Sequence, residues 1–294
     1  MLVFMLLFVK GGLNMTDNSS KVIAILSGKG GVGRSFLTVS LGVSLALRNK
    51  KVLMIDNNPA VGDLAYLTGI LGEIVFDVAD IIKGRCEAYK AIYKCNLNIL
   101  GESNYKRSIN SMFLGFTGSL DLMPSPHEYD DMLSPDIMKL IIDTMSKRYD
   151  YILVDSQSGL GCGFDSSTVS ADEALIITTT DPSSVADCRM INDKLIDKEI
   201  SEIRLVINKF NNKNFIKSKF YSNLDDLIDD CEVQLISLIK DDNEIAIANA
   251  SLNPFEKYKD LIYSTINNKH KKSVMTEVIN LAARLDGENR NLCI

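Results

Sequence analysis

Short apolar runs alternate with longer stretches of helical periodicity along most of this 294-residue chain. The runs are rich in β-branched residues and are apolar at consecutive positions, which indicates strands that are buried on both faces. The predicted strands cover residues 22–26, 52–55, 120–123, 151–154, 174–179, 205–208 and 233–239. Their alternation with helices predicts an α/β fold with a doubly wound, mostly parallel sheet flanked by helices. In such a fold the ligand binds at the carboxyl ends of the strands.

One domain, residues 21–288, accounts for this pattern. Residues 1–20 are predicted to be an N-terminal extension outside the fold, and residues 289–294 a short tail. The pattern weakens near residues 95–119, which predicts an insertion that is either a surface excursion or a partner-binding element. A last helix is predicted between Ser273, a good N-cap, and Gly287, because apolar residues recur at helical spacing between them.

A glycine-rich turn directly after the first predicted strand carries the strongest functional signal. Residues 27–35 read Ser-Gly-Lys-Gly-Gly-Val-Gly-Arg-Ser. Consecutive backbone N–H groups in such a turn can curl around an anion, and the helix that follows adds its positive N-terminal end. The predicted ligand is therefore a nucleotide. The residues predicted to bind it here are Gly28, Lys29, Gly30, Gly31, Val32, Gly33, Arg34, Ser35 and Phe36.

Two nucleotide-binding patterns fit this turn, and the glycines do not choose between them. The glycine spacing satisfies the dinucleotide fingerprint, and Asp56 ends the next strand roughly where a ribose-binding carboxylate belongs. The turn also nearly fits the P-loop pattern. That pattern has lysine where Arg34 stands, and a magnesium-binding hydroxyl where Ser35 stands.

Strand-end residues further along the chain favour the P-loop. Asp155 is predicted to end a buried strand at the same sheet edge as the glycine turn. Mg²⁺ prefers oxygen ligands and keeps most of its waters, so an aspartate there that hydrogen-bonds those waters or the Ser35 hydroxyl would complete a Mg²⁺ site. The polar turn 156–159 that follows is suited to sensing a terminal phosphate. Asn208 ends another strand with an amide that can pair with a purine edge.

Composition argues against several other classes of function. A net charge of −6 and a pI near 5.1 give no long-range attraction to nucleic acid. The six cysteines form no C-x-x-C pair and there are two histidines, so a zinc site or a disulfide framework is not indicated and a reduced, cytoplasmic setting fits best. The apolar residues 1–9 are too few to span a membrane, which takes about 20 residues. They are either an extension without a folded role or a weak membrane tether.

The ordered set of motifs resembles the MinD/ParA group of deviant Walker A ATPases, and within it the septum-site-determining MinD branch. The resemblance covers about residues 21–288 and rests on segments 27–33, 52–56, 77–86, 151–155, 171–187 and 205–208. It implies a P-loop NTPase fold that binds ATP and Mg²⁺, and a nucleotide-dependent homodimer in which Lys29 reaches the phosphates bound by the partner subunit. The implied catalytic residues are Lys29, Arg34 and Asp56, and the implied metal residues are Ser35, Asp56 and Asp155.

The chain departs from the group at three points. Arg34 replaces the usual lysine, and Asn58 replaces the second aspartate of an Asp-x-Asp motif, so an amide stands where a carboxylate could orient the attacking water. Both changes predict weak ATP hydrolysis or none. The C-terminal membrane helix typical of the MinD branch is missing, which leaves the expected localisation cytoplasmic, with peripheral membrane attachment in doubt.

Several functions stay open at this point. The first is an ATP-dependent dimeric switch that positions cell-division or other polar machinery through an unidentified protein partner. The second is a non-hydrolysing scaffold of the same fold, and a flagellar- or pilus-positioning role is a third. An NAD-dependent oxidoreductase would leave Ser35, Asp155 and Asn208 without a purpose. Measuring ATP hydrolysis distinguishes the switch from the scaffold. Binding assays with ATP and NAD side by side distinguish both of them from the oxidoreductase.

Overall fold

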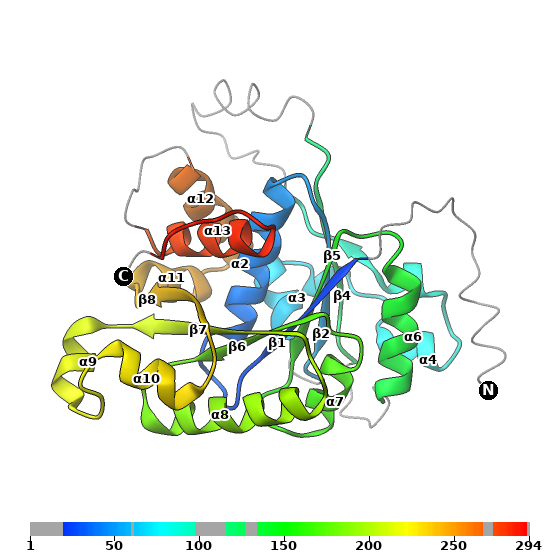
Figure 1. Cartoon of the computed structure of the whole chain (residues 1–294). Helices are drawn as coiled ribbons and strands as arrows, with labels where there is room; N and C mark the ends of the chain where they lie inside the picture. Colours follow the sequence, from blue (N-terminus) through cyan, green and yellow to red (C-terminus); the bar gives the residue numbers. More distant parts are fainter. Residues whose placement is uncertain (1–19, 60–61, 98–115, 127–133, 267–272, 293–294) are drawn as a thin grey trace.

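The structure, a computed structural model, describes residues 20–59, 62–97, 116–126, 134–266 and 273–292. These residues build one eight-stranded sheet with the order β3-β4-β2-β5-β1-β6-β7-β8 (Figure 1). Neighbouring strands are parallel except β3, which pairs antiparallel with β4. The strands are β1 (Lys21–Leu26), β2 (Lys51–Asn57), β3 (Tyr93–Lys94), β4 (Ser119–Met123), β5 (Tyr151–Ser156), β6 (Glu173–Thr178), β7 (Glu202–Phe210) and β8 (Leu235–Lys240).

The predicted α/β fold with a doubly wound, mostly parallel sheet is confirmed. Each strand predicted from the sequence is present, although β8 begins at Leu235 rather than at residue 233. The pattern does not predict β3, because a strand of two residues is too short to show a period. Every residue of the central strands β5 and β6 is buried, which is why their sequences are apolar at consecutive positions.

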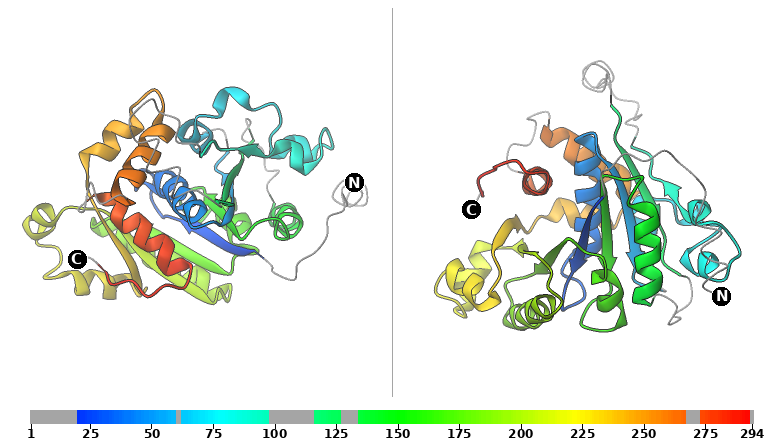
Figure 2. Two further views of the ribbon diagram at one scale, coloured as in Figure 1. Left: turned by 90° about the horizontal axis from the view of Figure 1, so that it is seen from above. Right: turned by 45° about the vertical axis from the view of Figure 1, so that its right-hand side comes forward.

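Helices cover both faces of the sheet (Figures 1 and 2). Side chains of β1 show the division, because Ile23 and Ile25 pack into one layer while Ala24 and Leu26 pack into the other. The first layer holds α2 (Arg34–Leu47), α3 (Asp63–Thr68), α11 (Asn243–Asn249), α12 (Pro254–Ile266) and α13 (Val274–Leu285). The second holds α4 (Val78–Ile82), α6 (Pro135–Met145), α7 (Cys162–Thr168), α8 (Pro182–Asp197), α9 (Asn212–Ser218) and α10 (Leu224–Cys231). Short 3₁₀ helices are η1 (Leu71–Glu73) and η2 (Ala88–Ala91).

The predicted C-terminal helix is α13, and its ends are as expected. The Ser273 hydroxyl caps it by accepting a hydrogen bond from the backbone N–H of Met275 at 3.2 Å. Gly287 follows the helix with a φ of 87°, in the left-handed region that favours glycine. Val278 and Leu281 are completely buried, so the helix packs on the core. No helix in the described part of the chain is both long enough and apolar enough to cross a bilayer.

Several sequence-based expectations concern residues outside the described ones. Most of the N-terminal extension 1–20, residues 98–115 of the predicted insertion and both histidines, His127 and His270, lie there. Those expectations stay predictions. Part of the predicted tail is described, and Arg284 holds it against α13 by donating to the backbone carbonyls of Arg290 and Asn291.

The strand order places one crevice at the centre of the sheet. From β1 the chain reaches β2 on one side, with β5 later inserted between them, and it reaches β6 on the other side. Neighbouring connections therefore diverge at β1, and a crevice opens at the carboxyl ends of β1, β5 and β2. The glycine turn, Asp56 and Asp155 lie at these three ends, and Asn208 lies further along the sheet, near the end of β7.

Candidate nucleotide-binding site

The turn between β1 and α2 has the conformation that its glycines predict. Gly33 is the N-cap of α2 and has a φ of 93°. Space is equally limiting, because a Cβ at Gly33 would lie 2.4 Å from the amide nitrogen of Asn208. A Cβ at Gly28 would lie 2.2 Å from the Cβ of Asp187 on α8. The backbone of the turn is therefore held closely against β7 and α8.

Asp155 joins the end of β5 to the first turns of α2. Its Oδ1 accepts hydrogen bonds from Arg34 Nε at 2.9 Å and Thr38 Oγ1 at 3.2 Å, and its Oδ2 accepts one from Ser35 Oγ at 2.8 Å. The side chain is completely buried. Burial raises the pKa of Asp155, and the Arg34 charge together with the hydroxyl donors opposes that rise.

Asp56 is the direct neighbour of Asp155 in the register of β2 and β5. It is completely buried, and its two oxygens accept hydrogen bonds from the backbone N–H groups of Asn58 at 3.0 Å and Leu64 at 3.3 Å. Burial is the main cause that raises the pKa of Asp56 to about 8, and the negative charge of Asp155 adds to it. A cation bound beside the two carboxylates would favour their ionised forms.

Arg34 is buried in an ion pair rather than extended into solvent. Its Nε is 2.9 Å from Asp155 Oδ1, and its Nη1 donates to Ser27 Oγ at 2.7 Å. The guanidinium thus ties the ends of β1 and β5 to α2. A lysine has one terminal nitrogen for phosphate or protein, whereas the planar guanidinium can hold protein atoms with part of its N–H groups and keep the rest for a ligand.

Lys29 lies against its own chain, at the start of α8. Its Nζ is 3.2 Å from Asp181 Oδ1 and donates to Ser183 Oγ at 2.9 Å. Partial burial works against ionisation of Asp181, but hydrogen bonds led by those from Thr179 and Ser184 lower its pKa below the ordinary value. Asp181 is therefore a charged partner for Lys29. Both side chains are about half exposed, so the pair is weak and Lys29 can leave it.

Asn208 and Lys209 at the end of β7 hold the glycine turn from the other side. The amide nitrogen of Asn208 donates to the Val32 carbonyl at 2.7 Å, and Lys209 Nζ donates to the Gly31 carbonyl at 2.7 Å. Asn208 therefore uses one amide N–H on the turn itself. Its carbonyl oxygen and its second amide N–H remain for a base edge.

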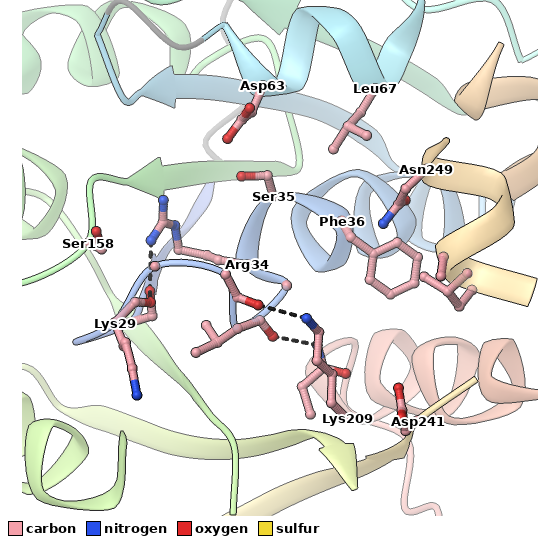
Figure 3. A pocket seen from close by; sticks show the side chains of 18 of the residues that line it. Lys29, Arg34, Ser35, Phe36, Asp63, Leu67, Ser158, Lys209, Asp241 and Asn249 are labelled. Carbon is pink, nitrogen blue, oxygen red and sulfur yellow. Dashed lines mark hydrogen bonds between the residues drawn. The ribbon is translucent and has the colours of Figure 1, made fainter. Parts of the chain in front are cut away.

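These residues surround one cavity of about 710 Å³ (Figure 3). Figure 3 shows Ser35, Asp63 and Ser158 at one end and Phe36, Asn249 and Asp241 at the other. The first end borders the glycine turn, which suits phosphates, and the second includes an aromatic ring, which suits a base. The volume lies in the range of small-molecule sites.

The donor set fits Mg²⁺ held together with phosphates. In the part of the chain that the structure describes, no group of three or more His, Cys, Asp or Glu side chains could hold a metal ion alone. Ser35 Oγ and Asp155 Oδ2 form a hydroxyl–carboxylate pair 2.8 Å apart, with Asp56 behind it. Mg²⁺ keeps several waters and takes few protein ligands, so such a pair with substrate oxygens is sufficient.

The structure brings the predicted site residues together. Residues 29–36 and Asn208 line the cavity, and the buried Asp56 and Asp155 lie behind Ser35. Gly28 does not line the cavity and packs on α8 instead.

Sequence reasoning missed several residues of this site, among them Thr38, Lys209 and Asp63. Thr38 follows Arg34 by one helical turn and Lys209 follows Asn208 directly, so both had a local signal. Asp63 had none, because an acidic residue at the start of a helix is ordinary.

Comparisons with known proteins identify the family of this chain and its fold. Residues 20–203 match the family described as "AAA domain". The septum site-determining protein MinD of Bacillus subtilis (strain 168) is 28% identical over 231 residues, covering 78% of this chain and 79% of that protein. MinD in a MinC:MinD cell division protein complex from Aquifex aeolicus is similar in structure, with a TM-score of 0.71 and 28% identity. The match covers 94% of this chain and 99% of that chain. MinD complexed with Mg-ADP from Pyrococcus horikoshii OT3 has a TM-score of 0.70 and 22% identity, and the match covers 91% of this chain and 96% of that chain. At this identity the similarity shows a shared fold and nothing more.

The family match covers residues 20–203, which is most of the chain, and the solved MinD structures share its fold. The protein belongs to the AAA domain family, as a MinD/ParA-type P-loop ATPase.

Proposed function

We propose that the protein is an ATP-binding molecular switch that dimerises when loaded, turns ATP over slowly, and positions cell-division or partition machinery. One observation carries the proposal. The glycine turn, the Ser35 hydroxyl and the Asp56–Asp155 pair meet beside one cavity at the point where the sheet connections diverge.

The residues around the cavity define how ATP and Mg²⁺ would be held. The backbone of residues 28–33 and the start of α2 would bind the phosphates, and Ser35 with Asp155 would hold the metal, whose charge would stabilise the phosphate oxygens. Phe36 and the carbonyl of Asn208 would face the base. The Mg-ADP present in the Pyrococcus horikoshii relative supports the same ligand class.

Two residues support slow turnover. Arg34 is fixed by Asp155 and Ser27, so reaching the phosphates would require it to break a buried ion pair or to use its remaining N–H groups. Asn58 lines the cavity with an amide, which can donate and accept hydrogen bonds but carries no negative charge. Both changes lower the stabilisation available to the transition state.

The position of Lys29 supports a nucleotide-dependent homodimer. The lysine is half exposed and held only by a surface pair with Asp181 and a hydroxyl. Release of this pair costs about 0–1 kcal/mol, which a phosphate from a second subunit can offset. Dimerisation would then depend on the nucleotide.

The relatives indicate the process that the switch serves. They include septum site-determining proteins and a ParA family ATPase from Chlorobium tepidum TLS, the latter similar in fold at 20% identity. We therefore propose a role in placing a septum or a partitioned cargo, in the cytoplasm and with peripheral membrane contact as a further option. The protein partner stays unidentified.

Calorimetry and chromatography test the proposal on the full chain. Titration with ATP in excess Mg²⁺ should show one site per chain, and S35A should weaken it. Size-exclusion chromatography should give a dimer with ATP and a monomer with ADP. K29A should remove the dimer, whereas K217A, at an exposed position on α9, should not. Absence of heat on ATP addition would refute the switch.

A non-hydrolysing scaffold is the second candidate, favoured by Arg34 and Asn58 together. The scaffold would be selected if the wild type binds ATP but releases phosphate no faster than S35A does.

A further inference from the structure

The cavity contains a carboxylate that the family resemblance does not predict. The resemblance implies an aspartate at the position of Asn58, and the asparagine present there supplies no negative charge. Asp63, the first residue of α3, lines the same cavity. The chain thus has an acidic side chain near the position from which one is missing.

Backbone contacts place Asp63 at the phosphate end of the cavity. The N–H of Leu64 donates to Asp56 Oδ2 at 3.3 Å, which fixes the start of α3 to the end of β2. Asp56 neighbours Asp155, whose Oδ2 accepts from Ser35 Oγ at 2.8 Å. Asp63 is close enough for its charge to act on Asp56. Figure 3 shows its carboxylate at the end that holds Ser35, away from Phe36 and Asn249.

Asp63 is available to a ligand, unlike the two buried acids beside Ser35. Asp241, which also lines the cavity and is exposed, lies at the other end with Phe36 and Asn249. Asp56 accepts two backbone hydrogen bonds, and Asp155 accepts three from side chains. Asp242, which also lines the cavity, caps α11 by accepting from the N–H of Glu244 at 2.9 Å. Asp63 is partly exposed and accepts no hydrogen bond from any residue that the structure describes.

We propose that Asp63 is a catalytic carboxylate of this ATPase and orients the attacking water, in place of the aspartate replaced by Asn58. The inference rests on the proposed function. Asp63 accepts a hydrogen bond from the water, whose oxygen then bonds to the γ-phosphorus. The bond from that phosphorus to the β–γ bridging oxygen breaks, its electron pair stays on ADP, and the proton lost by the water ends on the released phosphate. The slow turnover of the protein depends on this side chain.

An acidic residue at the first position of a helix also has a structural role, because it interacts favourably with the helix dipole. That role would change stability and leave turnover untouched. Asp136 serves as the matched control, since it is also acidic, lies in the first turn of α6 and is exposed outside the cavity.

The test measures ATP affinity by calorimetry and single-turnover phosphate release on the full chain with Mg²⁺. D63N should lose turnover by about 100-fold, in line with the usual contribution of a positioned acid or base, while the ATP Kd changes by less than about threefold. D136N should match the wild type in both. The double variant N58D/D63N returns a carboxylate to the cavity and should release phosphate at least about tenfold faster than D63N.

Defined results overturn the inference. D63N turnover within about threefold of the wild type would do so, as would a loss of ATP affinity equal to the loss of rate. Wild-type turnover no faster than that of S35A, with ATP still bound, would overturn the role of Asp63 and leave an ATP-binding protein standing. Failure to bind ATP at all would instead remove the proposed function itself.

Discussion

Replacement of Asp56 by asparagine should change how stability depends on pH. The folded pKa of Asp56 is about 8 against an ordinary value of 3.8. Between these values the folded protein keeps a proton that the unfolded chain has released. The folded state binds more protons, so this group makes the wild type less stable as pH rises through the window. D56N removes this titrating group, and with it the part of the pH dependence of the unfolding free energy that Asp56 causes.

The size of the effect follows from the width of the window. Each pH unit inside it removes about 1.4 kcal/mol of wild-type stability, so the interval from pH 5 to pH 7 removes about 2.7 kcal/mol. Asparagine has the shape of the protonated acid, so at pH 5 the two proteins should differ by about 1 kcal/mol or less. At pH 7 D56N should be the more stable, and above about pH 8 the difference should become constant.

Equilibrium urea unfolding of the nucleotide-free, metal-free protein, at one-unit steps from pH 5 to pH 9, measures this difference. D136N, at an exposed acid, controls for the loss of one negative charge. Parallel stability curves for D56N and the wild type from pH 5 to pH 7 would refute the reasoning, because they would show that Asp56 ionises in the folded state as readily as in the unfolded chain.

Three further substitutions test the site and the core. R34M leaves Asp155 buried without its cation and should lower the unfolding free energy by about 3 kcal/mol at pH 7.5, measured by urea unfolding. The loss should shrink as the pH is lowered, because burial raises the pKa of Asp155 and its protonated form needs no cation; a loss that stays equal as the pH falls would contradict this. G33A forces a Cβ against Asn208 at a φ of 93° and should abolish ATP binding in calorimetry, whereas unchanged affinity would show that the turn can shift. L281A removes a fully buried side chain of α13 and should lower the unfolding free energy by about 2–5 kcal/mol, while a loss below about 1 kcal/mol would place α13 outside the core.

The order of residues alone predicts the fold class and most of the phosphate end of the site. Strands buried on both faces must be apolar at consecutive positions, so their runs could be recognised without knowing their neighbours. The glycine turn and Asp155 follow such strands directly, and the carboxyl ends of parallel strands share one edge. Position in the chain was therefore enough to bring Ser35, Asp56 and Asp155 together.

The groups that those side chains contact depend on how the chain folds over long distances in the sequence. The ion pair of Arg34 with Asp155 joins residues 121 positions apart, and the bond from Asn208 to Val32 joins residues 176 positions apart. Neither leaves a periodic or local trace in the sequence. The same holds for Asp63, which reads as an ordinary first residue of a helix until folding brings α3 over the cavity. Local physics fixes where chains turn and which strands are buried, whereas partners at long range depend on how the layers close around the sheet.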